Sequence, residues 1–205
     1  PEIDEVQMLQ DAVFNLQSVL PLPLQLDSSN TQALEKAMRM YNGKAMINSV
    51  NGKQSSMNEV FPLVQKYGGV VVCLCLDENG IPETAKGRIA IAEKIIKTAE
   101  SYGIDKKDLV VDALVMTIST NKDNAKETLK AVEYIRHELG VGTVLGVSNI
   151  SFGLPKREAI NTAFFTLALK AGLSAGIINP LSESMMNAYY SYNALEGFDD
   201  NCTEY

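Results

Sequence analysis

The sequence predicts an α/β fold in which short parallel strands alternate with amphipathic helices. Six apolar runs each end in a polar residue, helical patterns lie between them, and the strand ends recur every 21 to 37 residues. That alternation and spacing are typical of repeated βα units. With 205 residues, 46% of them hydrophobic, the chain can bury a sizeable core as one domain. The predicted strands are LPLQLD (22–27), KAMINS (44–49), GGVVVCLCLD (68–77), DLVVDALV (108–115), GTVLGVSN (142–149) and AGIINP (175–180).

The helices follow from apolar residues that recur at helical spacing between these runs. The opening segment 4–20 has this pattern, and so do five later segments. They span residues 31–41, 56–68, 84–103, 124–140 and 157–172. The last four end in Gly68, Gly103, Gly140 and Gly172. Glycine is favoured just past a helix because it adopts the left-handed conformation without strain.

Composition narrows the function classes. The net charge of −7 and the pI near 4.8 argue against nucleic acid as a partner, since phosphates are bound by basic surfaces. No apolar run approaches twenty residues, which argues against a membrane span. The chain has three cysteines, Cys73, Cys75 and Cys202. Because this number is odd and two of them lie within one predicted strand, the sequence favours reduced thiols in the cytoplasm. Cys73 and Cys75 alternate within a strand, and His137 lies far away on a helical surface. We therefore expect buried apolar thiols and no metal site.

The residues that close the six strands form the strongest functional signal. They are Asp27, Asn48, Asp77, Asp112, Asn149 and Asn179. In parallel βα folds the carboxyl ends of the strands carry the active site. Asp and Asn are also favoured helix caps, so capping explains any single one of them. Six in succession favour a site, with Asp77 in DENG as the most turn-like member.

This set has a distinct chemical character. It contains carboxylates and amides, with no His, Lys or Cys to serve as a nucleophile. No glycine-rich phosphate loop follows the late strands. Such a set suits a flat heterocycle that presents several N–H donors and ring acceptors.

Four motifs at the strand ends carry a resemblance. QLDSSN (25–30), AMINSVN (45–51), VVDALV (110–115) and LGVSNIS (145–151) resemble the pterin-binding methyltransferase family. The sequence is most similar to the folate-binding domain of cobalamin-dependent methionine synthase. It also resembles methyltetrahydrofolate:corrinoid methyltransferases and, more broadly, dihydropteroate synthase.

The resemblance implies a (β/α)8 TIM barrel of the dihydropteroate-synthase-like type. A full barrel has eight strands, and this sequence shows six and opens with a helix. Residues 1–205 are therefore interpreted as a partial pterin-binding barrel that lacks the first two βα units. The segment from about 181 to 205 resembles the helical region that leads toward a corrinoid module.

The resemblance also assigns roles, residue by residue. Asp27, Asn48 and Asp112 match positions that hold the edges of the pterin ring. Asn149 matches the amide near N5 of the folate and is the predicted catalytic residue. Ser148 and Arg157 match positions near the ring and the rest of the folate. Asn179 is a further, weaker candidate. Two departures from relatives are Phe152, where some have Gln, and Ala113, where many have Pro.

The implied substrate is 5-methyltetrahydrofolate, and the implied methyl acceptor is a Co(I) cobalamin or other corrinoid on a partner domain or protein. The methyl group leaves N5 only if the nitrogen can accept the bonding electron pair, which a hydrogen bond from Asn149 assists as charge develops. The free-standing relatives are dimeric, so a homodimer is one state that the resemblance allows.

Three rival interpretations remain open at this point. Dihydropteroate synthase uses the same barrel, but its late-strand Lys and Ser-x-Arg motif are missing from the expected places, although Lys156 and Arg157 occur nearby. A non-catalytic pterin-binding fragment would bind folate without methyl transfer. An unrelated βα barrel would use the polar strand ends only as helix caps.

Overall fold

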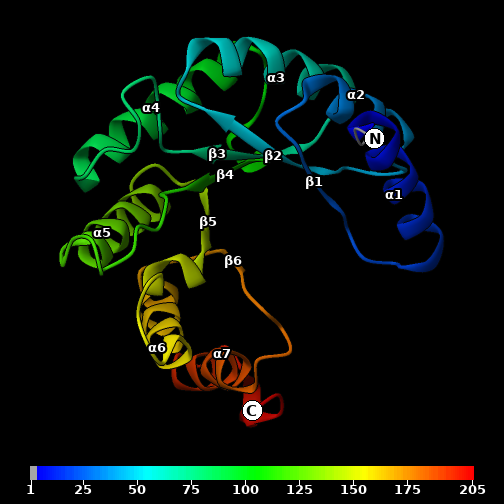
Figure 1. Cartoon of the computed structure of the whole chain (residues 1–205). Helices are drawn as coiled ribbons and strands as arrows, with labels where there is room; N and C mark the ends of the chain where they lie inside the picture. Colours follow the sequence, from blue (N-terminus) through cyan, green and yellow to red (C-terminus); the bar gives the residue numbers. More distant parts are fainter. Residues whose placement is uncertain (1–3) are drawn as a thin grey trace. The chain divides into compact units, whose positions relative to one another are not determined.

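The computed structural model describes residues 4–205 and confirms the predicted alternation of strands and helices (Figure 1). Five of the six predicted strands form within their apolar runs, and the second continues beyond its run to Asn51. The strands are β1 (Gln25–Asp27), β2 (Met46–Asn51), β3 (Val70–Leu74), β4 (Leu109–Asp112), β5 (Gly142–Gly146) and β6 (Ala175–Ile177). The helices are α1 (Glu5–Val19), α2 (Thr31–Met40), α3 (Gln54–Tyr67), α4 (Ala85–Ser101), α5 (Asn124–His137), α6 (Arg157–Lys170) and α7 (Glu183–Leu195). Short 3-10 turns are η1 (Lys106–Asp108), η2 (Val147–Ser151) and η3 (Asp200–Cys202).

The strand order is β1-β2-β3-β4-β5-β6, which is the order of the chain. The pairs β1–β2, β2–β3 and β5–β6 are parallel, with Leu26 opposite Ile47 and Val144 opposite Ala175. Helices connect the consecutive parallel strands, as βα repeats require. The predicted fold class is confirmed: the chain has six of the eight repeats of a (β/α)8 barrel.

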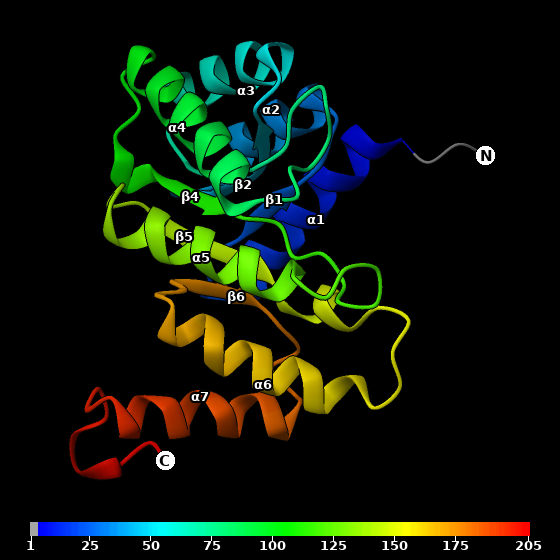
Figure 2. The ribbon, with the colours of Figure 1, turned by 90° about the vertical axis from the view of Figure 1, so that its left-hand side faces the viewer.

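The chain divides into two compact units. Unit 1 extends to Ile81 and includes Ala90–Val111, and unit 2 comprises Pro82–Ile89 and Asp112–Tyr205. In unit 1, α2 and α3 lie on the same side of β1, β2 and β3 (Figures 1 and 2). The apolar residues of strands and helices that form its core are almost fully buried. They include Leu26, Ile47, Val71, Leu34, Met57 and Phe61.

Unit 2 has its own core, formed by one strand and the helices around it. Leu145 of β5 and Ile135 of α5 are fully buried, and Phe164 and Phe165 of α6 are nearly so. Helices α6 and α7 lie side by side in both views (Figure 2). β6 is exposed along its whole length.

Local sequence signals set the element boundaries. Asp4 caps α1 and Asn30 caps α2 through side-chain oxygens that accept backbone N–H groups. Gly68 and Gly103 follow their helices with φ of 74°, as predicted from their places in the sequence. Among residues 4–205, no helix is long and apolar enough to cross a membrane.

The thiol prediction is confirmed for Cys73 and Cys75, which are both fully buried. Burial raises the pKa of the Cys73 thiol to about 12, because the charged thiolate loses its hydration there. The predicted placement of His137 is also confirmed, since it lies exposed near the end of α5. Cys73 and Cys75 are thus part of the packed core, and His137 faces solvent.

Candidate functional site

In unit 1 the structure brings Asp27, the last residue of β1, together with Asn48, which lies opposite it within β2. Asn48 Nδ2 donates to Asp27 Oδ2 over 3.2 Å, and the Ser28 amide donates to the Asn48 carbonyl over 3.1 Å. The β2–β3 register shifts between Asn48 and Val50. Such irregularities redirect side chains and are common beside binding sites. The pair presents a carboxylate and an amide with donor and acceptor capacity to spare.

A cavity of about 350 Å³ surrounds this pair. Its walls are rich in hydroxyl groups and come from β1, β2 and the first turns of α2 and α3. The polar members of the lining are Asp27, Ser28, Ser29, Thr31, Asn48, Ser49, Asn51, Lys53, Ser55, Ser56 and Glu59. This lining provides many hydrogen-bonding groups and little apolar surface, which suits a polar ring edge.

In unit 2, Asp112 ends β4 and is only 9% exposed. Its Oδ1 accepts the backbone N–H of Leu114 over 2.7 Å. Burial raises the pKa of Asp112 to about 6, while the Leu114 amide and the charge of Arg88 oppose that rise. Asp112 therefore stays largely ionised at neutral pH and can accept N–H donors, but it is close to its titration range.

The segment 147–151, predicted to be a strand end, forms the turn η2 and carries Ser148 and Asn149. Both residues are exposed. The amide of Asn149 lies close to Gly146, where an added Cβ would be 3.1 Å from Asn149 Nδ2. The glycine thus leaves room for this amide to lie back over the end of β5.

Backbone and hydroxyl contacts join η2 to the loop that follows Asp112. Ile118 N donates to the Ile150 carbonyl over 3.0 Å. The hydroxyls of Thr117 and Ser119 donate to the Phe152 carbonyl over 2.7 and 2.9 Å. The loops that carry Asp112 and Asn149 are therefore neighbours within unit 2.

Arg157, the first residue of α6, contacts η2. Its Nη2 donates to the Ser148 carbonyl over 2.8 Å and its Nε to Ser151 Oγ over 2.9 Å. The guanidinium carbon lies 4.6 Å from the centre of the Phe152 ring. Phe152 thus packs against Arg157. This arrangement braces the turn that carries Asn149.

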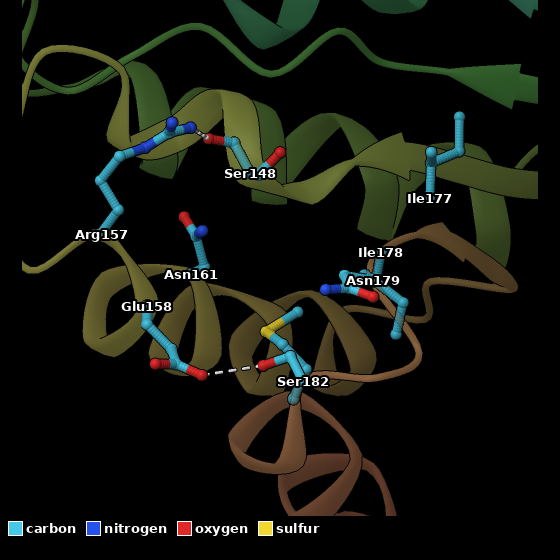
Figure 3. Close-up of a pocket in the computed structure, with 9 residues that line it drawn as sticks. Ser148, Arg157, Glu158, Asn161, Ile177, Ile178, Asn179 and Ser182 are labelled. Atoms are coloured by element: carbon cyan, nitrogen blue, oxygen red, sulfur yellow. Dashed lines mark hydrogen bonds between the residues drawn. The ribbon is translucent and has the colours of Figure 1, made fainter.

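Ser148, Arg157 and Asn179 line a second cavity, of about 480 Å³, within unit 2 (Figure 3). Its other lining residues are Glu158, Asn161, Ile177, Ile178, Ser182 and Met185. Asn161 points toward Ser148 and Arg157 in Figure 3. Ser182 and Ser184 donate to Glu158 Oε1 over 2.9 and 2.6 Å, and these bonds lower the pKa of Glu158.

The structure tests the capping explanation of the strand ends. The residues before α2, α3, α5, α6 and α7 are Asn30, Lys53, Asp123, Lys156 and Ser182. Asp27, Asn48, Asp112, Asn149 and Asn179 cap none of these helices. Asp77 is the turn residue that its sequence indicates, since its backbone pairs with Gly80 and its Oδ1 accepts Asn79 N. The capping explanation is therefore wrong for these five residues.

The two cavities hold several residues that the sequence did not single out. In unit 2, Asn161 Oδ1 is buried and has no hydrogen-bond partner in the described part of the chain. A ligand or water donor would satisfy this acceptor. In unit 1 the serines near α3 have no distinctive sequence signal, because serine is common in loops. Within residues 4–205 there is also no cluster of three or more His, Cys, Asp or Glu residues that could hold a metal ion.

The structure is thus that of a parallel α/β protein with polar residues at or near its strand ends and a cavity in each unit. The sequence profile of the pterin-binding enzymes matches residues 2–179. The chain belongs to this family.

Two relatives are similar along most of this chain. A methylcorrinoid:tetrahydrofolate methyltransferase of Eubacterium limosum is 28% identical over 210 residues, which cover 100% of this chain and 76% of the relative. A methionine synthase of Mycobacterium tuberculosis is 32% identical over 197 residues. That alignment covers 90% of this chain and 16% of the synthase. The chain thus corresponds to a small part of the methionine synthase.

Solved structures with the same fold include dihydropteroate synthases. The enzyme from Vibrio fischeri superposes with a TM-score of 0.75 at 17% identity, covering 96% of this chain and 77% of that chain. The Yersinia pestis enzyme gives a TM-score of 0.73 at 16% identity, covering 96% and 79%. At these identities the likeness establishes the fold alone.

Proposed function

We propose that this chain binds 5-methyltetrahydrofolate and transfers the N5 methyl group to a Co(I) corrinoid on another domain or protein. One observation carries the proposal: the two carboxylates and two amides at or near the strand ends cap none of the helices whose capping residues are known. They are Asp27, Asn48, Asp112 and Asn149. Asp27 and Asn48 are bonded to each other, and Asp112 is buried beside the turn that bears Asn149. The name of the Eubacterium limosum relative, a methylcorrinoid:tetrahydrofolate methyltransferase, supports the choice of folate and corrinoid as substrates.

Each residue has a task in binding the pterin. The Asp112 carboxylate accepts N–H groups from the pyrimidine side of the ring, for which its ionised form is required. Asp27 and Asn48 provide an acceptor and a donor for the other ring edge. Burial of Asp112 strengthens its bonds to a ligand because water competes poorly there. Ser148 and Arg157 line the cavity of about 480 Å³ in unit 2, which offers room for the rest of the folate.

Asn149 supports the departure of the methyl group. When the C–N5 bond breaks, both its electrons stay on N5, and the carbon is attacked by the electron pair that Co(I) supplies. Asn149 does not titrate in the useful range, so it acts by donating a hydrogen bond to N5 that strengthens as the electron pair develops. The proton that finally binds N5 arrives through water. The exposure of Asn149 leaves the turn open to the acceptor.

The opposite direction of transfer uses the same groups. The Eubacterium limosum relative is named for transfer from a methylcorrinoid to tetrahydrofolate. A site that stabilises one transition state accelerates both directions, so the substrates present determine the net direction. Dihydropteroate synthesis is disfavoured, because the late-strand lysine and the Ser-x-Arg motif of that family are missing from the expected places in the sequence.

The proposal is tested by mixing the chain with 5-methyltetrahydrofolate and Co(I) cobalamin and following methylcobalamin formation in a single turnover. Folate binding is measured alongside by calorimetry. Saturable binding together with transfer supports the proposal. Binding without transfer makes the chain a pterin-binding fragment, and formation of dihydropteroate from its precursors would reassign the reaction. Absence of both binding and transfer would overturn the proposal.

A further inference from the structure

Arg88 is a charged side chain in an unexpected place. It lies in the first turn of α4 and is fully buried. Among residues 4–205 it is the largest fully buried side chain. A buried guanidinium destabilises a fold unless its N–H groups are hydrogen-bonded. Its surroundings therefore indicate what it does.

The contacts of Arg88 converge on the loop that follows Asp112. Nη1 donates to the carbonyls of Ala113 and Leu114 over 3.2 and 2.9 Å, and to Thr128 Oγ1 of α5 over 2.7 Å. Nε donates to the Pro82 carbonyl over 2.9 Å. All of these groups belong to unit 2. The guanidinium thus spans four acceptors, which a single ammonium group cannot do with the same geometry.

The loop that Arg88 holds has an unfavourable backbone conformation. Leu114 has φ of 61°, a left-handed conformation that a leucine adopts only when its surroundings impose it. In this conformation the Leu114 carbonyl faces Arg88 and Thr128, while its N–H donates to Asp112 Oδ1 over 2.7 Å. One residue, Leu114, therefore connects the guanidinium to the carboxylate.

We propose that Arg88 is a positioning residue for Asp112. By binding the Ala113 and Leu114 carbonyls, it fixes the left-handed turn in which the Leu114 N–H points at the carboxylate. This contact sets the orientation of the Asp112 side chain. The inference rests on the proposed function in assigning the pterin to Asp112. The charge of Arg88 also lowers the pKa of Asp112, against the effect of burial. Both effects prepare an ionised, oriented acceptor before the ligand arrives.

The test compares wild type with Arg88→Lys and Arg88→Met in the full chain. Carboxyl NMR follows the titration of Asp112, amide hydrogen exchange follows Leu114, and calorimetry gives the Kd for 5-methyltetrahydrofolate. We expect protection of the Leu114 amide to fall about tenfold or more in both variants, as for the loss of one or two hydrogen bonds, with a Kd about tenfold higher. In Arg88→Met, which also removes the charge, Asp112 should titrate at a higher pH.

Two further variants separate this role from general destabilisation. Ile135→Val shortens a buried apolar side chain on α5 and serves as a control that also lowers stability, as the Arg88 variants do. It should leave the hydrogen-exchange protection of the Leu114 amide and the titration of Asp112 unchanged. Thr128→Val is nearly isosteric and removes one acceptor of Arg88, so it should change the Leu114 signal in the same direction by a smaller factor. It decides the question if the Arg88 variants do not fold.

Unchanged Leu114 protection and Asp112 titration in folded Arg88 variants, or in Thr128→Val when those variants do not fold, would overturn the proposal. Both measurements are made on the free protein. If wild type binds no folate, the proposed function fails, while these two measurements still decide the role of Arg88.

Discussion

The two strand-end carboxylates, Asp27 in unit 1 and Asp112 in unit 2, are the same side chain in two environments. Asp27 is exposed and bonded to the amide of Asn48. Asp112 is 9% exposed, bonded to a backbone N–H, and has its pKa raised to about 6. Their difference arises from burial, because a carboxylate that loses hydration favours its protonated form. Equivalent positions in two βα repeats therefore give an exposed acceptor and a buried acceptor whose charge depends on pH near 6.

The units also differ in what their amides are expected to do. Asn48 in unit 1 is paired with a carboxylate, so it is suited to holding the ring. Asn149 in unit 2 is exposed on a turn that Arg157 braces, so it is suited to a contact that strengthens during reaction. The following predictions test this division between a binding amide and a reacting amide, and the difference between the two carboxylates.

The largest effect is expected from the two amides. Asn149→Ala should lower the single-turnover transfer rate by roughly 10²–10³, because it removes a bond made to developing charge. Asn48→Ala should raise the folate Kd by about tenfold, with a nearly normal rate at saturating folate. Stopped-flow measurement of methylcobalamin formation gives both values. Equal rate losses in the two variants would contradict the division.

The next effect concerns stability. The pKa of Asp112 is raised from 3.8 to about 6 in the folded chain. Between those pH values the folded state binds more protons than the unfolded state, so the free energy of unfolding falls as pH rises and then levels off above pH 6. The contribution is about 3 kcal/mol. The Asp112→Asn variant lacks this pH-dependent contribution. In urea unfolding of both proteins, the free energy of unfolding of wild type should therefore fall relative to that of the variant as pH rises from 4 to 7. A difference that is constant with pH would contradict the buried state of Asp112.

The affinity for folate should also depend on the protonation state of Asp112. As pH falls below the pKa of about 6, protonation of free Asp112 should weaken binding by about tenfold at pH 5, because the protonated group accepts fewer donors. Asp27→Asn should keep this pH dependence, and Asp112→Asn should lose it, in calorimetric titrations from pH 5 to 8. If Asp27→Asn abolishes the dependence, the roles of the two carboxylates are reversed.

The smallest effect is expected at Gly146. Its backbone φ of −76° accommodates alanine, but a Cβ there would lie 3.1 Å from Asn149 Nδ2 and displace the amide slightly. Gly146→Ala should therefore lower the transfer rate by about threefold to tenfold, with little change in the melting temperature. The rate is measured at saturating folate. An unchanged rate would show that the resting position of the Asn149 amide does not matter.

The sequence predicted the repeating part of the fold because that part depends on local patterns. The run GTVLGVSN contains β5, and VVVCLCLD contains β3, because β-branched apolar residues favour buried strands. Gly68 and Gly103 marked helix ends through their backbone freedom. The same regularity placed Asp27 and Asp112 at the carboxyl ends of their strands and Asn149 just after its strand, whereas Asn48 lies within β2, which continues to Asn51.

One further element had a sequence signal that only the structure explains. Arg88 shares a helical face with Ile91, Ala92 and Ile95, all of them buried, so a charge at that spacing indicates an internal partner. The pattern does not reveal which carbonyls accept hydrogen bonds from the Arg88 guanidinium. That depends on how α4 approaches the loop after β4.

By itself, the sequence determined the order of strands and helices, the polar residues at the strand ends and the family, since each is recorded in local residue types and their spacing. Only the tertiary structure decided that Asp27 pairs with Asn48, that Asp112 is buried with a raised pKa, and that Arg157 braces the turn of Asn149. Burial, pKa and hydrogen-bond partners depend on groups far apart in the chain. They become defined only when packing excludes water and fixes those groups together.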